Sequence, residues 1–188
     1  MTLENDAGRI GRRMVAEGLV GGNFGNMSVR EHSGFSITGR GAFLDDPGTL
    51  VFVPDGGPVP PSASSECRVH RDIYSRHSFG AIVHAHPVHA IALSFDLAAI
   101  MLEDAEGRLF CPRIPVVGGE PGTAELAERI ARAMTDSPVV IARGHGTFAG
   151  GATLEEAYLL TSVAEHGCRI LWLRRAAGLN GSSGPKTS

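Results

Sequence analysis

Two short apolar runs, each followed directly by a loop that contains histidine, most constrain the fold of this chain. The first is "GAIVHAH" at residues 80–86, and the second is "PVVIARGHG" at residues 138–146. Short apolar runs bounded by turn residues are typical of buried strands. We therefore expect two buried strands whose ends carry His84, His86 and His145.

Helices and further strands are expected around these two strands. Apolar residues at helical spacing predict helices at residues 3–19, 65–77, 87–94, 123–134 and 153–178. Further strands are expected at residues 27–31, 34–39, 49–54, 113–118 and 147–151, the first two as a hairpin. The last helix has a capping box, Thr153 with Glu156, and a glycine, Gly178, placed to end it. Residues 95–113 give no clear assignment.

Length and composition favour one globular domain without a surface for nucleic acid or membrane. The 188 residues are 43% hydrophobic and 20% charged, with a formal net charge of -3, values ordinary for a soluble protein. We expect one domain over residues 1–178 and a disordered tail over residues 179–188. The N-terminus lacks the order of a secretory signal, and no apolar run reaches membrane-spanning length, so a cytoplasmic protein is expected.

The three histidines at the strand ends are candidate metal ligands. His84 and His86 are two residues apart in a strand, so both side chains leave the same face of the sheet. An isolated pair of this kind is more often a hydrogen-bonded pair than a metal site. His145 changes that balance, because it also follows an apolar strand and lies between two glycines that allow a sharp turn. Three histidine ligands with an open fourth position are typical of a catalytic zinc site.

Two further residues near these strand ends have alternative interpretations. His89 can be a third ligand, a partner that orients a ligand, or a polar residue on a helix face, and the last two are favoured. Glu66 in "SASSECRVH" begins a helix after a serine-rich loop, where its carboxylate can face a cavity. An isolated glutamate at such a position more often only complements the helix dipole. If the histidines form a catalytic site, Glu66 is the best candidate for its base.

Six segments of the sequence resemble the class II aldolase/adducin family, over about residues 3–175. They are "GNFGNMSVR" at 22–30, "ITGRG" at 37–41, "PSASSECRVHRDIY" at 61–74, "VHAHPVHAIALS" at 83–94, "RIPVVG" at 113–118 and "ARGHGTFAGG" at 142–151. Each segment is modest alone, but six of them in the right order are specific. The resemblance implies an α/β fold with three α/β/α layers around a mainly antiparallel central sheet.

The resemblance also implies site residues, a cofactor and partners. The metal would be zinc (Zn2+), although sites of three histidines accept other divalent ions. Its ligands fall on His84, His86 and His145, and the catalytic glutamate falls on Glu66. A phosphate pocket would be built by Gly25, Asn26, Thr38, Gly39, Ser64 and Ser65. The family further implies a phosphorylated sugar as substrate and a homotetramer with active sites at subunit interfaces.

The implied activity is a reversible, zinc-dependent cleavage of a phosphorylated ketose, such as L-fuculose 1-phosphate, to dihydroxyacetone phosphate and an aldehyde. Glu66 would move the proton at C3. A related sugar-phosphate dehydratase or decarboxylase is an alternative, because each also needs a metal-stabilised intermediate.

Two other functions in the family are disfavoured. In the 4-epimerase branch, the family pattern has an aspartate at the position that matches Glu66. Non-catalytic adducin-like modules lack the histidines that match the metal ligands. One departure from the aldolase pattern concerns tyrosine, which relatives commonly use near the aldehyde. This chain has only Tyr74 and Tyr158, both in helical patterns, so the acid at the C4 oxygen is not identified.

Overall fold

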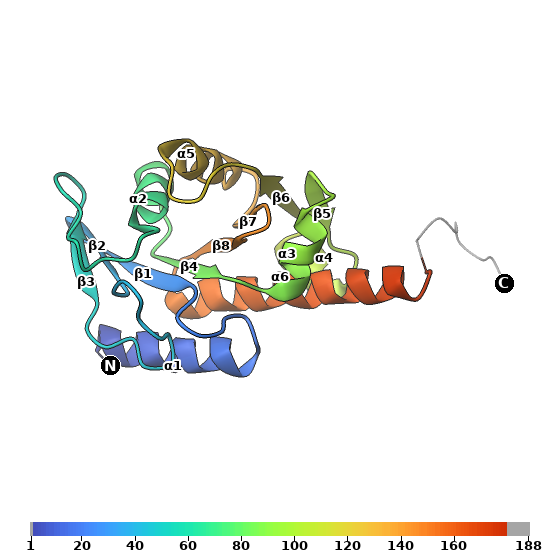
Figure 1. Ribbon diagram of the computed structural model, residues 1–188, viewed down its shortest axis with the longest axis horizontal. Helices are drawn as coiled ribbons and strands as arrows, with labels where there is room; N and C mark the ends of the chain where they lie inside the picture. The colour runs from blue at the N-terminus through green and yellow to red at the C-terminus, as the bar shows by residue number, and fades with distance from the viewer. Residues whose placement is uncertain (1, 180–188) are drawn as a thin grey trace.

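An eight-stranded sheet forms the centre of the computed structural model, which describes residues 2–179 (Figure 1). The strand order is β3-β2-β1-β4-β8-β7-β6-β5. The strands are β1 (Asn26–Glu31), β2 (Gly34–Ile37), β3 (Val51–Pro54), β4 (Ala81–Ala85), β5 (Ala99–Met101), β6 (Arg113–Val117), β7 (Val139–Ala142) and β8 (Gly146–Gly151).

The α/β class expected from the sequence is confirmed, but the sheet, expected to be mainly antiparallel, is a mixed sheet. Strands β6 and β7 run parallel, whereas the other neighbouring pairs are antiparallel. The helix α5 (Ala124–Ala133) connects β6 to β7. A helical crossover of this kind returns the chain in its original direction, so the two strands that it joins lie parallel.

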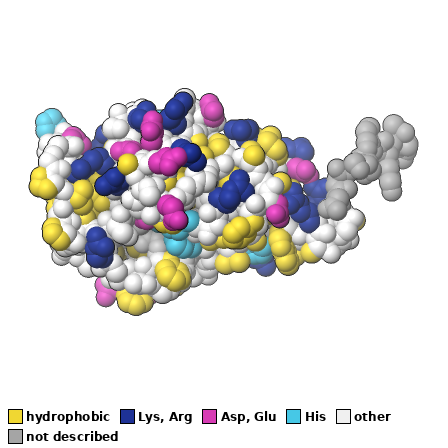
Figure 2. Space-filling view, turned by 45° about the horizontal axis from the view of Figure 1, so that its top comes forward, with side chains coloured by type: hydrophobic (Ala, Val, Ile, Leu, Met, Phe, Trp, Pro, Cys, Tyr) yellow, Lys and Arg dark blue, Asp and Glu magenta, His cyan; other side chains and the backbone are white. Residues whose placement is uncertain are grey.

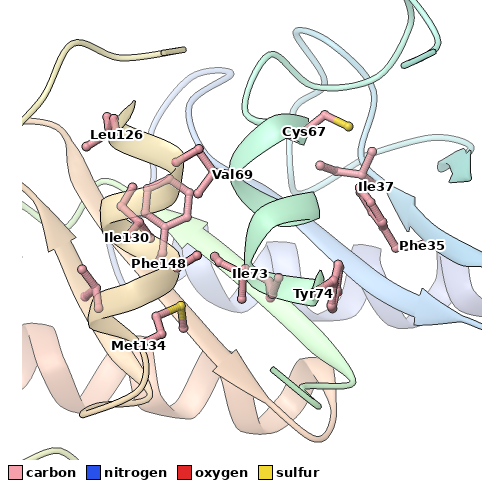
Figure 3. Packing of buried hydrophobic residues seen from close by; sticks show 14 of the residues in the cluster. Phe35, Ile37, Cys67, Val69, Ile73, Tyr74, Leu126, Ile130, Met134 and Phe148 are labelled. Carbon is pink, nitrogen blue, oxygen red and sulfur yellow. The ribbon is translucent and has the colours of Figure 1, made fainter. Parts of the chain in front are cut away.

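Helices cover both faces of the sheet. On one face lie α2 (Cys67–Arg76) and α5, and Figure 3 shows Phe148 of β8 packed between their side chains. On the other face lie α1 (Leu3–Ala16), α3 (Val88–Ser94), α4 (Ala105–Phe110) and α6 (Leu154–Ala176) (Figure 1). Residues of β7 alternate between the two cores, because successive side chains of a strand point to opposite faces. The fold therefore has three layers.

Most of the expected helices and strands are present, and the segment that the sequence left unassigned contains only short elements. The hairpin is confirmed, with Arg30 opposite Phe35, while α1 ends at Ala16 instead of reaching residue 19. The unassigned residues 95–113 contain the three-residue strand β5 and the six-residue helix α4. Elements this short contain too few residues to show a hydrophobic period.

The long helix α6 begins and ends as expected. Thr153 accepts a hydrogen bond from the backbone of Glu156, and Gly178 has the left-handed conformation that stops a helix. Across residues 2–179, no helix combines the length and the apolar character that crossing a membrane requires. Apart from residue 179, the expected disordered tail lies outside the described residues.

Candidate active site

The three candidate histidines come together at one edge of the sheet. His84 lies in β4, His86 follows the end of that strand, and His145 directly precedes β8. Because β4 and β8 are neighbours with Ala85 opposite Thr147, the end of one strand meets the beginning of the other. The ligand nitrogens of the three side chains lie within 4.8 Å of one another. This spacing can hold a metal ion.

Hydrogen bonding fixes the orientation of the His84 ring. Its Nδ1 lies 2.9 Å from the carbonyl oxygen of Thr147, and a carbonyl can only accept, so Nδ1 carries the ring proton. The unprotonated Nε2 then faces the other histidines, at 3.0 Å from Nε2 of His86. A histidine that donates its second ring nitrogen to a carbonyl is the usual arrangement for a metal ligand.

Burial keeps all three imidazoles in the neutral form that binds metal. Burial lowers the pKa of His84 well below its ordinary value, and the neighbouring His86 and His145 lower it further. It lowers the pKa of His86 to about 4, and it lowers the pKa of His145. Metal ligands must be unprotonated, so the three side chains fit a divalent metal without the loss of a proton.

The loop that carries His145 is held by contacts with the end of α3. The Arg143 guanidinium donates to the carbonyl oxygens of Ser94, Phe95 and Leu97. The backbone N–H of Gly144 donates to Ser94 Oγ at 2.9 Å, and Gly144 adopts a φ of 67° that favours glycine. These contacts fix His145 against β4.

Gly146 provides the close approach between β8 and the two histidines in and just after the neighbouring strand β4. A Cβ at this position would lie 2.2 Å from the carbonyl oxygen of Ala85 and 3.1 Å from Cε1 of His84. The first distance is far below van der Waals contact, so the two strands would have to separate.

We therefore expect Gly146→Ala to reduce bound metal and to destabilise the fold by about 1–3 kcal/mol, the usual cost of overpacking. Metal content and thermal unfolding of the purified variant measure the two effects. Gly21→Ala is the matched control, because a Cβ there meets nothing within 4 Å. Equal metal content and equal stability in both variants would contradict the role given to Gly146.

Glu66 faces the same cavity as the histidines. It is buried at the N-terminal end of α2, and its side chain makes no capping hydrogen bond. Its Oε2 has no hydrogen-bond partner among the described residues. Burial raises the pKa of the carboxyl group. The geometry therefore matches a carboxyl group that faces a ligand better than one that only complements a helix dipole.

Small and polar residues form the remaining walls of this cavity, whose volume is about 150 Å³. Five of the six residues expected in a phosphate pocket are there: Gly25, Asn26, Gly39, Ser64 and Ser65. The structure places Thr38 differently, fully buried behind the lining, where its Oγ accepts a hydrogen bond from the Met27 N–H at 3.2 Å. Thr38 therefore does not line the cavity in this structure, and its part in phosphate binding stays a prediction.

Three residues that the sequence interpretation did not single out also line the cavity: Asn23, Phe24 and Gly41. The Phe24 ring stacks on His86 with centroids 5.4 Å apart, although the Phe24 side chain is largely exposed. Asn23 and Phe24 belong to the glycine-rich segment at 22–30, so proximity to Gly25 and Asn26 was the only available signal. An exposed phenylalanine in a loop does not by itself indicate a site.

His89 and the two tyrosines lie outside this constellation. His89 Nδ1 is 2.6 Å from Glu165 of α6, so the histidine joins α3 to α6 as a polar residue of a helix face. Both tyrosines are buried. The Tyr74 hydroxyl is hydrogen-bonded to Ser28, and the Tyr158 hydroxyl donates to the Glu17 carboxylate. Within residues 2–179, no tyrosine lines the cavity.

Comparisons with known proteins agree with this geometry. Residues 6–172 match the sequence model described as the class II aldolase and adducin N-terminal domain. L-fuculose phosphate aldolase of Methanocaldococcus jannaschii is 31% identical over 170 residues, which are 88% of this chain and 93% of that protein. Methylthioribulose-1-phosphate dehydratase of Gluconobacter oxydans is 32% identical over 160 residues, covering 75% and 77%.

A solved structure shares the whole architecture. The crystal structure of L-fuculose-1-phosphate aldolase from Thermus thermophilus superposes with a TM-score of 0.91 at 36% sequence identity. The match covers 97% of this chain and 98% of that chain. The three-layer arrangement around the mixed sheet is therefore the fold of that aldolase.

Proposed function

Because the chain belongs to the class II aldolase and adducin family, we propose that it is a metal-dependent aldolase acting on a phosphorylated ketose. The reaction is the reversible cleavage of the ketose to dihydroxyacetone phosphate and an aldehyde, and L-fuculose 1-phosphate is the first substrate to test. One observation carries the proposal: three neutral histidines and a buried glutamate, whose Oε2 has no partner within residues 2–179, face one cavity whose other wall is small and polar.

His84, His86 and His145 would hold the metal, with zinc as the proposed ion. Three imidazoles leave a coordination position open for substrate, which distinguishes a catalytic zinc site from a structural one. When bound, the metal supplies Lewis-acid polarisation of the substrate carbonyl and disperses the negative charge that develops on cleavage.

Glu66 is the proposed proton carrier at C3. Cleavage of the C3–C4 bond leaves the bonding electron pair on C3, where the dihydroxyacetone phosphate half needs a proton. In the reverse direction the same proton must be removed before the new bond forms. A carboxyl group whose pKa is raised by burial can hold this proton and return it, and a nearby cation would counteract part of that rise.

The loops opposite the histidines are the proposed phosphate site. Gly25 and Gly39 allow the backbone to approach a ligand, while Asn26, Ser64 and Ser65 supply polar groups close to the N-terminus of α2. Backbone N–H groups at a helix N-terminus favour an anion without a lysine. Gly25 is required for shape, because a Cβ there would lie 2.7 Å from the carbonyl oxygen of His84.

A sugar-phosphate dehydratase is the second candidate. The Gluconobacter oxydans relative is named as a dehydratase, and the described cavity has no tyrosine that could serve the C4 oxygen. Dehydration needs the same removal of a proton next to a carbonyl, but it does not break the carbon chain. The two reactions therefore differ in their products, and a product assay separates them.

We further propose a homotetramer in the cytoplasm, with active sites at subunit interfaces. Hydrophobic side chains reach the surface in several patches on the face shown in Figure 2. Phe95, Met101, Leu109 and Phe110 are exposed around α3, β5 and α4, and the proposed subunit contact would cover side chains of this kind. Light scattering of the purified protein measures the assembly.

The deciding experiment assays purified, metal-quantified protein with L-fuculose 1-phosphate and a panel of ketose 1-phosphates. We expect release of dihydroxyacetone phosphate that stops on chelation and returns with zinc. Loss of water without cleavage would replace the aldolase by a dehydratase. Metal-loaded protein that neither cleaves nor dehydrates any member of the panel would overturn both proposals.

A further inference from the structure

A buried chain of hydrogen bonds runs behind Glu66 along the inner face of α2. Ser28 Oγ of β1 lies 2.7 Å from His70 Nδ1 and 2.8 Å from the Tyr74 hydroxyl. His70 is completely buried, and its ring meets Phe148 edge-on at 6.2 Å. The proposed reaction uses none of these three side chains, yet His70 lies one helical turn from Glu66.

The direction of donation along these hydrogen bonds follows from the groups at the two ends, the His70 ring and the Tyr74 hydroxyl. Burial lowers the pKa of His70 to about 3, so the ring is neutral and carries one proton. If the Tyr74 hydroxyl donates to Ser28, the Ser28 proton still needs an acceptor, and among the described contacts of Ser28 Oγ that acceptor is His70 Nδ1. The ring proton is then on Nε2. The opposite direction would leave the phenolic proton of Tyr74 in the interior without an acceptor, which is costly. The chain therefore places an N–H at Nε2.

Three buried atoms near this point have no hydrogen-bond partner among the described residues: His70 Nε2, Glu66 Oε2 and Asn26 Oδ1. Glu66 directly precedes α2, and His70 lies four residues further along the chain, in the first turn of that helix. Asn26 precedes Ser28 by two residues on β1, and both side chains therefore leave the same face. Because Ser28 of the same face contacts His70, Asn26 also faces α2, and a donor and two acceptors lie in the layer between α2 and β1.

We propose that His70 positions the Glu66 carboxyl group by donating its Nε2–H to one enclosed water molecule. The water accepts from His70 and donates its two protons to Glu66 Oε2 and Asn26 Oδ1, so every group is satisfied. Buried waters commonly make about three hydrogen bonds of this kind. The inference rests on the proposed function, since it gives His70 the task of holding the carboxyl group that moves the C3 proton.

Such a contact acts on the rate of proton transfer rather than on substrate binding. It holds one oxygen of Glu66 in place, and the other oxygen remains free to face the substrate. A misplaced catalytic group lowers turnover, while the phosphate loops and the metal ligands still bind. His70 is thus a positioning residue, which reaches the substrate only through Glu66.

The test compares His70→Asn with His70→Gln. The asparagine amide reaches the place of Nδ1 and keeps a partner for Ser28, whereas the glutamine amide reaches the place of Nε2 and keeps a donor toward Glu66. We expect His70→Asn to lower kcat by about 10- to 100-fold with unchanged KM and metal content. His70→Gln should retain most of the wild-type kcat. Equal kcat values in the two variants, whether high or low, would overturn the inference.

A spectroscopic measurement separates this inference from the proposed function. If the wild type turns over no ketose phosphate, the proposed function fails, and ¹⁵N NMR of the histidine side chains still decides the role of His70. We expect a neutral ring with its proton on Nε2, whose ¹⁵N shift changes in Glu66→Gln and not in Glu128→Gln, a change of an exposed carboxylate on α5. A ring proton on Nδ1 of His70, or a His70 ¹⁵N shift that is the same in the wild type and in Glu66→Gln, would rule out the water-mediated contact between His70 and Glu66.

Discussion

Replacing Glu66 with glutamine should leave bound metal in place and lower aldol cleavage by about 10²- to 10⁴-fold, the usual contribution of general acid–base catalysis. Glutamine has nearly the same shape as glutamate but cannot accept or return a proton. Glu66 is buried and makes no side-chain hydrogen bond to α2, so the helix start does not depend on its charge. The loss should therefore fall on chemistry and not on folding.

Exchange of deuterium from water into C3 of dihydroxyacetone phosphate isolates this step, because it needs no aldehyde. We expect the wild type to exchange this hydrogen and Glu66→Gln to lose the exchange. Glu128→Gln is the matched control, since that carboxylate lies on the surface of α5. Exchange at the wild-type rate in Glu66→Gln would remove Glu66 from its proposed role, whereas loss of metal would show that it supports the metal site.

The candidate site could be predicted largely because its residues lie at the ends of buried strands. An apolar run identifies a strand without reference to the rest of the chain, and alternation then places His84 and His86 on one face. That His145 joins them depends on β4 and β8 being neighbours, a long-range pairing that spacing alone does not contain. The order of the six segments supplied this information through resemblance to a family.

Other parts of the site depend on contacts that no local pattern encodes. Thr38 is fully buried and does not line the cavity, and its Oγ accepts a hydrogen bond from the backbone N–H of Met27. Phe24 reaches the site only because its loop folds over His86. The role of His70 follows from its hydrogen bond to Ser28, which is distant in sequence, and from the bond between Ser28 and Tyr74, which lies one helical turn after His70. Hydrogen bonds decide the cases of Thr38 and His70, ring stacking decides that of Phe24, and both kinds of contact are properties of the folded chain.

His84→Ala should reduce metal affinity by at least about 10²-fold, since changes of residues that only orient a ligand already cost up to that amount. His84 is the most buried of the three histidines, and its ring stacks on Phe148 with centroids 4.1 Å apart. Removing it takes away one ligand and part of the packing around β8. Activity and bound metal should therefore fall together, and added zinc should restore little of either.

His89→Ala is the matched control. It removes a histidine from the same segment, but this histidine binds Glu165 and not the three candidate ligands. Plasma emission of the purified variants measures the metal, and thermal unfolding separates loss of a ligand from loss of the fold.

His86→Ala adds a second test, because that ring is less buried than His84 and its removal should disturb the packing less. Wild-type metal content in both His84→Ala and His86→Ala would show that the three imidazoles do not form the metal site. Loss of metal in His89→Ala would instead extend the site to α3. We expect the first two variants to lose metal and His89→Ala to keep it, because within residues 2–179 only the strand ends bring histidine ligand nitrogens within reach of one ion.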